Sequence, residues 1–556
     1  MRSHNYKMKW IILAILMVCT GCHSLEESQE KETPVENKPV LTMEEASKED
    51  YGRYPEEITY TLGKMTAENN SNMPDGDTYE NNVYTRYLKD MLNIQNVNAF
   101  EAAGNLYDNV VSMAVTDNEL PDIMIVQDLD TLMELEKKNK IEDLSLSYQE
   151  CASPKIKEIY DSYDGAVLDR ATIDGKLMAI PGTNIQNGPN LLWLRKDWMD
   201  KLGLKAPTNL KEAEKIIQEF VEKDPGQNGR GQTVGLVFDA ANIGNPDKCY
   251  QLDPLFSYFG AYPQKWLKNE DGTITYGSTT KEAKEALKHL QKLYKKNILD
   301  SQFLVRTSAN IDQLIESGKC GSFFGPWWAP NNPIMNAYQI DRSADWQPYL
   351  IPTEEDGSIT TYRQDASNKY IVVKKGFEHP EIAIKIINVL FDYTRYVDIQ
   401  NQDMQNYYSL NVDPTARPLA VNVDYSDALA RTTESIERAL KGEKKEEELI
   451  TIEKSYYKIC KSYLSHRENP SPEEWAAYTS RITTVDMLSK AKVNYKETVI
   501  KSETRTMQKE GWNLNLMEKN AYLKIISGEA DIKEFDSFVK EWKKQGGNQI
   551  ERELAN

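Results

Sequence analysis

A short, uninterrupted apolar run, Ile123–Val126, constrains the fold of this chain more than any other feature. A proline precedes it, and a continuous run of this length is typical of a strand that is covered on both faces. Before it, the pattern predicts a half-buried strand over residues 58–62, a helix over 82–92 and a second strand over 97–100. A further helix pattern follows. This β-α-β-α-β order predicts a parallel-rich α/β sheet.

The predicted strands also indicate where a ligand would bind. Ligands of parallel α/β sheets lie at the carboxyl ends of the strands, so the loops after Leu62 and Val126 are candidate contact segments. A second region begins near Leu191. Farther along, apolar residues recur at helical spacing, and the chain from about Asp427 onward is charged and mostly helical in pattern.

Length and composition exclude several classes of protein. The 556 residues correspond to three or four domains or to two large lobes. A hydrophobic content of 40% with 28% charged residues is ordinary for a globular protein, and a mean hydropathy of -0.63 excludes a multi-span membrane protein. The net charge of -19 argues against non-specific nucleic-acid binding, which needs a cationic surface.

Residues 1–21 have the composition of a secretory signal peptide. Arg2, Lys7 and Lys9 give a positive start. The apolar segment Trp10–Val18 has about half of the roughly 20 residues that a membrane-spanning helix needs. A cleaved signal therefore fits this segment better than a transmembrane anchor.

The segment Cys19–Cys22 resembles a bacterial lipobox, in which Cys22 would be diacylated and become the mature N-terminus. Cys19 stands where the pattern usually has leucine. An ordinary signal peptide with an incidental cysteine is the alternative. Residues 22–45 are polar, charged and proline-containing, which predicts a flexible tether between lipid and folded body. Two acyl chains would hold the protein durably on a membrane.

No motif points to a specific catalytic chemistry. The chain has neither a GxxxxGK[ST] phosphate loop nor an HExxH zinc motif, and none of its five histidines lies near a convincing nucleophile in sequence. A glycosidase needs only two carboxylates, which 86 acidic residues leave open, but no acidic pair stands out. We expect a protein that is not an enzyme and carries no cofactor.

The segment Asp224–Thr233 resembles a degraded calcium loop. Gly226 and Gln232 occupy positions that should carry carboxylates, and only Asp224 and Asn228 remain as good side-chain oxygen ligands. A tight polar turn is the simpler interpretation, and no metal is predicted.

Four cysteines of the exported body, at widely separated positions, offer no CxxC pair, so a structural zinc site is unsupported. Export permits disulfides, and free buried thiols are the alternative. These residues are Cys151, Cys249, Cys320 and Cys460.

Aromatic residues are the most suggestive ligand-binding feature. The 31 tyrosines and 10 tryptophans provide many rings on which the apolar faces of sugars could pack. In Gly325–Pro330 two adjacent tryptophans stand between prolines, on a turn where neighbouring side chains diverge. We expect at least one of Trp327 and Trp328 to contact a ligand, with burial of both in the core as the alternative.

Several segments, in this order and spacing, together resemble the extracellular solute-binding proteins of carbohydrate ABC importers. Among these, the chain is similar to the large family 1 lipoproteins of Gram-positive bacteria, including the LipO-type lipoproteins. Besides the lipobox and the acidic tether, the segments are Pro121–Met124, Asp174–Pro181, Leu192–Trp198, Gly325–Trp327 and Phe535–Gly547.

The resemblance implies an α/β, two-lobe, periplasmic-binding-protein-like fold of class II, with a hinge and a helical C-terminal extension. The expected N-terminal lobe comprises residues 46–188 and about 350–415. The expected C-terminal lobe comprises 189–349 and about 416–556. The stretch Gly175–Pro181 would mark the first crossing between lobes, and the return crossing would lie near 349–370.

The resemblance also implies ligand contacts. Trp327 would lie in the cleft as a ring that stacks on sugar, and the loop 127–130 would supply polar contacts from the first lobe. The expected ligand-binding residues are Gln127, Asp128, Asp130, Asn190, Trp193, Trp327, Trp328 and Arg363.

The implied function is a lipid-anchored monomer on the extracellular face of the membrane. It would bind a carbohydrate or oligosaccharide by lobe closure and deliver it unchanged to an ABC permease. A surface glycan-degrading enzyme and a sensory or scaffold lipoprotein are the alternatives, and peptide ligands remain open within the first mechanism.

Overall fold

The computed structural model describes residues 41–245, 248–499 and 503–555. The predicted signal peptide, Cys22 and the tether up to residue 40 lie outside the described residues. The end of the predicted tether is helical instead: α1, Met43–Lys48, begins at Thr42, whose side chain accepts a hydrogen bond from the Glu45 amide. Buried Ala46 fixes α1 to the folded body.

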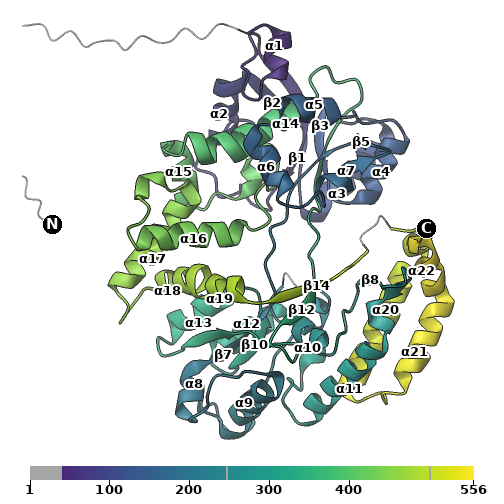
Figure 1. Cartoon of the computed structure of the whole chain (residues 1–556), viewed down its shortest axis with the longest axis vertical. Helices are drawn as coiled ribbons and strands as arrows, with labels where there is room; N and C mark the ends of the chain where they lie inside the picture. The colour runs from purple at the N-terminus through teal and green to yellow at the C-terminus, as the bar shows by residue number, and fades with distance from the viewer. Residues whose placement is uncertain (1–40, 246–247, 500–502, 556) are drawn as a thin grey trace, which may run out of the picture. The chain divides into compact units, whose positions relative to one another are not determined.

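The first of two main sheets has five strands in the order β2-β1-β3-β13-β6 (Figure 1). β1 pairs in parallel with β2 and β3, whereas β13 runs antiparallel to β3 and β6. The predicted buried strand is confirmed, because all four β3 residues are buried. The sheet is mixed, with parallel and antiparallel pairs, because β13 joins it after the chain has returned from the second sheet. The strands are β1 Ile58–Thr66, β2 Ile94–Ala103, β3 Ile123–Val126, β6 Ile180–Pro181 and β13 Tyr370–Val373.

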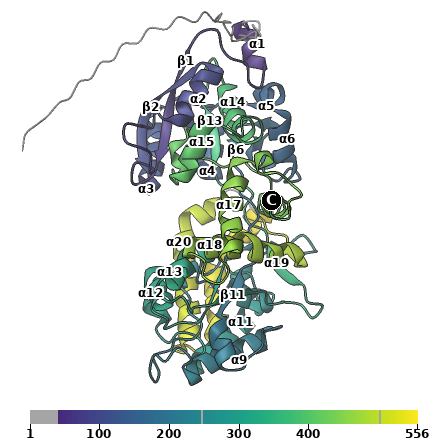
Figure 2. The ribbon, with the colours of Figure 1, turned by 90° about the vertical axis from the view of Figure 1, so that its left-hand side faces the viewer.

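Helices from residues 43–171 and from residues 382–409 cover this sheet and, with it, form the first lobe. Figure 2 shows α2, α14 and α15 beside it, and their apolar residues share its core. The helices of this lobe, besides α1, are α2 Val83–Leu92, α3 Gly104–Asp117, α4 Leu129–Lys137, α5 Ser145–Cys151, α6 Pro154–Asp161, α7 Leu168–Ala171, α14 Ile382–Ile387 and α15 Gln402–Ser409.

The second sheet has three antiparallel strands in the order β10-β7-β11, and the elements packed on it form the second lobe. Its strands are β7 Leu191–Arg195, β10 Ser322–Gly325 and β11 Trp346–Tyr349. Its helices before the C-terminal segment are α8 Lys196–Lys201, α9 Leu210–Lys223, α10 Asp253–Tyr258, α11 Lys281–Lys295, α12 Ser308–Glu316 and α13 Met335–Ile340.

The C-terminal segment is mostly helical, as expected, with one strand between two helical groups. The strand β14 pairs in parallel with β12 at the return crossing (Figure 1). The elements are α16 Ala428–Leu440, α17 Thr451–Ser465, α18 Pro472–Tyr478, α19 Val485–Lys490, β14 Val493–Lys496, α20 Arg505–Ser527, α21 Glu534–Trp542 and α22 Asn548–Ala555, and β12 is Ile359–Tyr362.

The packing moves two of the predicted lobe boundaries. The prediction placed residues from 350 in the first lobe, but Ile351 packs on the core of the second lobe, and packing on the first core resumes at Ala366. The prediction placed residues from 416 in the second lobe, but residues 416–428 pack on the first core. Leu419, Val421 and Val423 provide this contact. Their spacing is not that of a helix, so a search for helical periodicity does not find them.

The four described cysteines are free and buried, so the free-thiol alternative is the one observed. Burial raises the pKa of the Cys151, Cys320 and Cys460 thiols to about 12. Within the described ranges, no helix has the length and apolar character of a membrane span.

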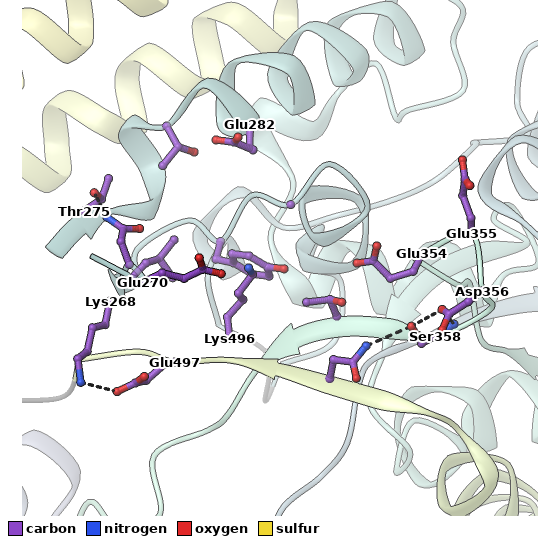
Figure 3. A pocket seen from close by; sticks show the side chains of 17 residues that line it. Lys268, Glu270, Thr275, Glu282, Glu354, Glu355, Asp356, Ser358, Lys496 and Glu497 are labelled. Carbon is purple, nitrogen blue, oxygen red and sulfur yellow. Dashed lines mark hydrogen bonds and ion pairs between the residues drawn. The ribbon is translucent and has the colours of Figure 1, made fainter. Parts of the chain in front are cut away.

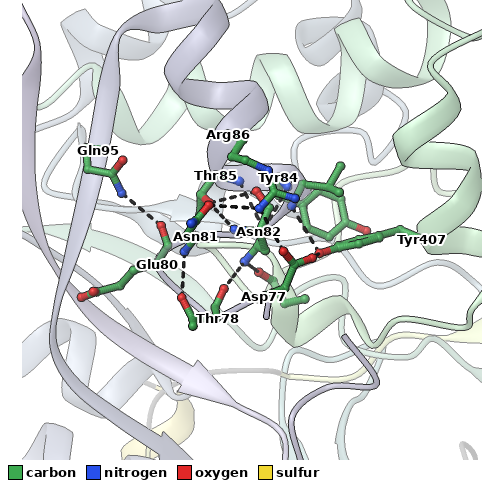
Figure 4. A network of polar contacts seen from close by, with 12 residues as sticks. Asp77, Thr78, Glu80, Asn81, Asn82, Tyr84, Thr85, Arg86, Gln95 and Tyr407 are labelled. Atoms are coloured by element: carbon green, nitrogen blue, oxygen red, sulfur yellow. Dashed lines mark hydrogen bonds and ion pairs between the residues drawn. The ribbon is translucent and has the colours of Figure 1, made fainter. Parts of the chain in front are cut away.

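The side chain of Asn82 connects its own segment, residues 78–85, to Ala416, which lies 334 residues farther along the chain (Figure 4). Its Oδ1 accepts hydrogen bonds from the Tyr84 and Thr85 amides at 2.9 and 3.3 Å, which caps α2. Its Nδ2 donates to the carbonyl oxygens of Thr78 and Ala416 at 2.9 and 3.1 Å. Asn82 therefore joins the start of α2 to the segment 416–428.

We predict that Asn82→Ala lowers the free energy of unfolding by about 3 kcal/mol, because it removes a helix cap and leaves buried carbonyl oxygens unpaired. The exposed neighbour Asn81 provides a matched control, and Asn81→Ala should cost less than about 1 kcal/mol. Urea unfolding of both variants measures the difference. Equal stabilities would contradict the role of Asn82.

Candidate functional site

A cavity of about 720 Å³, here the crossing cavity, lies where the chain passes between the two sheets. The first crossing contributes residues 183–185 and 187, the return crossing contributes 362–365 and 368, and the segment after β14 contributes Thr498, Val499 and Glu503. The second lobe adds residues 264–266. One cavity therefore collects side chains from both crossings, from the segment after β14 and from the second lobe.

Backbone hydrogen bonds hold the first crossing in place. Pro181 ends β6, and the next amides pair with other segments: Gly182 donates to Lys369 O at 2.8 Å and Thr183 to Asn422 O at 2.7 Å. The Gln186 amide donates to Ser426 O at 3.0 Å. The crossing thus lies between residues 366–369 and 422–426, which leaves side chains such as Asn184 to line the cavity.

Amide side chains are the commonest kind in the lining. Seven of the twenty lining residues are asparagine or glutamine, and each amide both donates and accepts hydrogen bonds. Sugar hydroxyls do the same, so this lining suits a neutral polyhydroxylated ligand. The amide residues are Asn184, Asn187, Asn245, Gln264, Gln364, Asn368 and Asn422.

Trp266, the first residue of β8 (Trp266–Lys268), supplies the aromatic wall. Its ring is half-buried and lies 4.7 Å from Tyr276, which closes β9 (Ile274–Tyr276). Tyr276 in turn stacks on Trp542 at 4.7 Å with an interplanar angle of 2°. The two buried rings support Trp266 from behind and leave it at the cavity wall.

A buried carboxyl group lies behind this wall. Glu518 on α20 is 2% exposed and accepts hydrogen bonds from the hydroxyls of Tyr276 and Ser278, each at 2.8 Å. Ser278 Oγ also accepts a hydrogen bond, at 2.7 Å, from the backbone amide of Gln264, which is a lining residue. Burial raises the pKa of Glu518 from its ordinary 4.5 to about 7.

A second buried carboxylate joins the return crossing to the second lobe. Asp253 accepts hydrogen bonds from the Tyr362 hydroxyl at 2.6 Å and from the Gly244 amide at 2.9 Å. Tyr362 and Gly244 both line the cavity. The ammonium group of Lys265 lies 4.7 Å from the centre of the Tyr362 ring. Asp253 thus holds the hydroxyl of Tyr362, and Lys265 lies over its ring.

The charges of the lining balance: Lys265 and Arg363 oppose Asp365 and Glu503. Of the residues predicted as ligand contacts, Arg363 lines this cavity, and its guanidinium group lies over the ring of Tyr495 at 4.7 Å. Asn190 lines a smaller adjoining cavity of about 30 Å³, whose walls include Tyr362 and Gln364.

The loop after β3 touches this region through Asp130. The backbone of Glu503, a lining residue, hydrogen-bonds to the Asp130 carboxylate. Burial and the charge of Glu503 raise the pKa of Asp130. Gln127 and Asp128 do not line the crossing cavity and bind neighbouring residues. Gln127 donates a hydrogen bond to the Asp108 carboxylate at 2.7 Å, and Asp128 caps α4 by accepting a hydrogen bond from the Thr131 amide.

The two adjacent tryptophans do not line the crossing cavity. Trp327 is 7% exposed, its Nε1 donates to Asn187 Oδ1 at 3.0 Å, and the guanidinium group of Arg481 lies 4.5 Å from its ring. Trp327 therefore supports a lining residue. Trp328 is half-buried against the core of the second lobe.

Trp193 requires a correction. It lies in the middle strand β7, is fully buried, and donates from Nε1 to Gly325 O at 3.3 Å. The expected ligand contact does not fit this position, because every face of the ring packs inside the second lobe. The alternation that marks a surface strand is absent from β7, where all five residues are buried.

The degraded calcium loop folds as a polar turn around Asp224. The Asp224 carboxylate accepts hydrogen bonds from the Asn228 and Gly229 amides, each at 2.9 Å, and from Thr233 Oγ1 at 2.5 Å. Asn228 directs its Nδ2 to Thr233 Oγ1 and Gly318 O. Both candidate oxygen ligands thus take part in closing the loop.

Sequence reasoning missed Trp266, Lys265, Tyr362 and Glu503. Trp266 follows the segment Pro263–Lys265, which has no periodic pattern. The one signal in the sequence for a sugar contact is an aromatic residue two positions after the side-chain amide of Gln264. Tyr362 stands next to Arg363, which was predicted, so the return crossing was located but its aromatic residue was not.

Comparison with known proteins gives a consistent result. Residues 70–392 match the model of the bacterial extracellular solute-binding protein family. The polygalacturonan/rhamnogalacturonan-binding protein YtcQ of Bacillus subtilis is 23% identical over 385 residues, which are 69% of this chain and 70% of YtcQ. Lipoprotein LipO of the same organism is 24% identical over 454 residues, 81% of this chain and 83% of LipO.

A crystal structure of an extracellular solute-binding protein from Bifidobacterium longum subsp. infantis superimposes with a TM-score of 0.64 at 15% sequence identity. The match covers 90% of this chain and 97% of that protein. It confirms the predicted periplasmic-binding-protein-like α/β fold.

We predict that Glu518 makes stability depend on pH. Between pH 4.5 and 7 the folded chain keeps a proton that the unfolded chain has released, so raising the pH through this window lowers the free energy of unfolding by about 3 kcal/mol. Glu518→Gln removes this titration. The difference in unfolding free energy between wild type and Glu518→Gln should therefore change with pH, and parallel profiles would contradict the assignment.

Proposed function

Since the chain belongs to the bacterial extracellular solute-binding protein family, we propose that it captures a carbohydrate or oligosaccharide in the crossing cavity. The observation that carries the proposal is Trp266 beside a lining rich in side-chain amides. A ring packs on the C–H face of a sugar while amides bond its hydroxyls. The name of the relative YtcQ, a polysaccharide-binding protein, supports the same ligand class.

Binding would be coupled to lobe closure. The crossing cavity draws residues from the crossings and from the second lobe, so a ligand there contacts segments that change position when a hinge closes. Moving a two-state equilibrium from 1:99 to 99:1 needs about 5.5 kcal/mol of differential affinity. Hydrogen bonds from several amides and one stacked ring can supply this. The closed form then docks on an ABC permease, and the saccharide is handed on unchanged.

The N-terminus and the relatives support a location on the outer face of the membrane. We propose that Cys22 is diacylated after removal of residues 1–21, and that residues from Cys22 onward tether the monomeric protein to the extracellular face of the membrane. The similarity to lipoprotein LipO supports this anchoring.

The first test concerns the aromatic wall. Trp266→Ala should weaken saccharide binding by about tenfold, because it removes a stacked ring. Trp512 is 76% exposed on α20, does not line the cavity, and provides a matched control whose change to alanine leaves affinity intact. Isothermal titration calorimetry with saccharides that raise the Tm measures both. Unchanged affinity in Trp266→Ala, or appearance of new reducing ends during incubation, would contradict the proposal.

The second test concerns the anchor. Cys22→Ser should release the protein from the membrane fraction into the medium, because the lipid is attached to this thiol. Cell fractionation with immunoblotting measures the distribution, with Cys19→Ser as the neighbouring control. Retention of Cys22→Ser on membranes would contradict lipidation at this residue.

A further inference from the structure

The helices α16 to α19, here the helical group, contribute no lining residue to the crossing cavity but are fixed beside both crossings. Residues 422–426, which lead into the group, accept hydrogen bonds from the first crossing. The strand β14, which leads out of it, pairs with β12 at the return crossing. Figure 3 shows β14, which ends at Lys496, beside β12. The group is therefore held at both of its ends.

Arg481 connects the helical group to the second lobe. It lies in the helical segment Thr479–Thr484, between α18 and α19. Its Cζ lies 4.0 Å from the centre of the Tyr456 ring on α17, and its Nη2 donates a hydrogen bond to the Tyr456 hydroxyl at 2.9 Å. Thr433 of α16 donates from Oγ1 to the carbonyl oxygen of Arg481 at 2.7 Å. The helices α16 and α17 thus fix both the backbone and the guanidinium group of Arg481.

The same guanidinium group lies over the ring of Trp327, 4.5 Å from its centre. Trp327 stands two residues after Gly325, at which β10 ends, in a turn where the Ala329 amide donates to Pro326 O at 3.0 Å. Because Trp327 lies beyond the strand, strand pairing does not set the direction of its ring. The contacts of the side chain itself set this direction.

The direction of the Trp327 ring in turn determines how Asn187, a lining residue of the crossing cavity, is oriented. An indole N–H can only donate, so the bond of 3.0 Å from Trp327 Nε1 places Oδ1 of Asn187 toward the indole. Turning this amide over would bring its NH₂ group against the indole N–H and lose the bond. The orientation of the Asn187 amide therefore depends on the position of the Trp327 ring.

The guanidinium group of Arg481 depends on the two rings for its stabilisation. In the part of the chain that the structure describes, Arg481 forms no ion pair with a carboxylate, and its buried Nε has no hydrogen-bond partner. The faces of Trp327 and Tyr456 are therefore the main groups that compensate its charge, as in other cation–π contacts. This attraction is mutual, so the guanidinium group also holds the Trp327 ring.

We propose that Arg481 is a positioning residue for the ligand: it holds the Trp327 ring, which orients the side-chain amide of Asn187 in the crossing cavity. The inference rests on the proposed function, because it takes the crossing cavity to be the ligand site. It gives the helical group the role of a support that acts on a ligand contact from behind the cavity.

The first measurement needs no ligand and follows the hydrogen on Trp327 Nε1 by NMR in deuterated water. Arg481→Met should make this hydrogen exchange about threefold faster, because the ring is no longer held against Asn187. Loss of one indole resonance in Trp327→Phe assigns the signal.

Exposed Arg438 on α16 provides the matched control, and Arg438→Met should leave the exchange rate unchanged. Tyr456→Phe, which keeps the ring and removes one bond to Arg481, should accelerate exchange less than Arg481→Met and replaces it if that variant does not fold. An unchanged rate in the variants of Arg481 and Tyr456, or equal acceleration by Arg438→Met, overturns the proposal.

The second measurement is calorimetric titration with trigalacturonic acid, maltotriose and kestose. For the probe that binds, Asn187→Ala and Arg481→Met should each weaken affinity by about threefold. Arg481→Met should cause no further loss in the Asn187→Ala background, because both changes act through one contact. Losses that multiply, or unchanged affinity in Arg481→Met alone, overturn the positioning role. Unchanged affinity in Asn187→Ala, or binding of none of the three probes, contradicts the proposed function instead, and the exchange rate then decides whether Arg481 holds the ring.

Discussion

The hydrogen bonds that hold the first crossing are the constraint on which the rest of the structure depends. The amides of Gly182, Thr183 and Gln186 pair with carbonyl oxygens of the return crossing and of segment 422–426. With the backbone fixed on both sides, the side chains of this segment have a defined direction toward the crossing cavity. These bonds give three chain segments that are far apart in sequence a common position beside the cavity.

Buried carboxyl groups extend this constraint into the second lobe. Asp253 connects Tyr362 of the return crossing to Gly244. Glu518 binds Tyr276, whose ring packs on Trp266, and Ser278, which in turn binds the backbone amide of Gln264. Both carboxyl groups lie behind lining residues and not among them. The cavity therefore presents balanced charges and many amides, although the whole chain carries a net charge of -19.

Much of the fold could be predicted from the sequence, because apolar spacing determines which faces are buried. The strand 123–126 and the helix over 82–92 appear where the pattern placed them. The site could be predicted only in part. Arg363 was located, whereas Trp193 is buried in the core and Trp266 was missed. A tryptophan in a core strand and one at a cavity wall look alike in sequence, since the difference arises from neighbours such as Trp542, which is distant along the chain.

Hydrogen–deuterium exchange with and without a bound saccharide tests the central claim most directly. Amide exchange depends on local opening, so a ligand in the crossing cavity should slow exchange in the segments that line it. We predict protection centred on residues 183–187, 264–266 and 362–368, with little change on α9 and α12. A saccharide that binds tightly but protects only other segments would contradict the account.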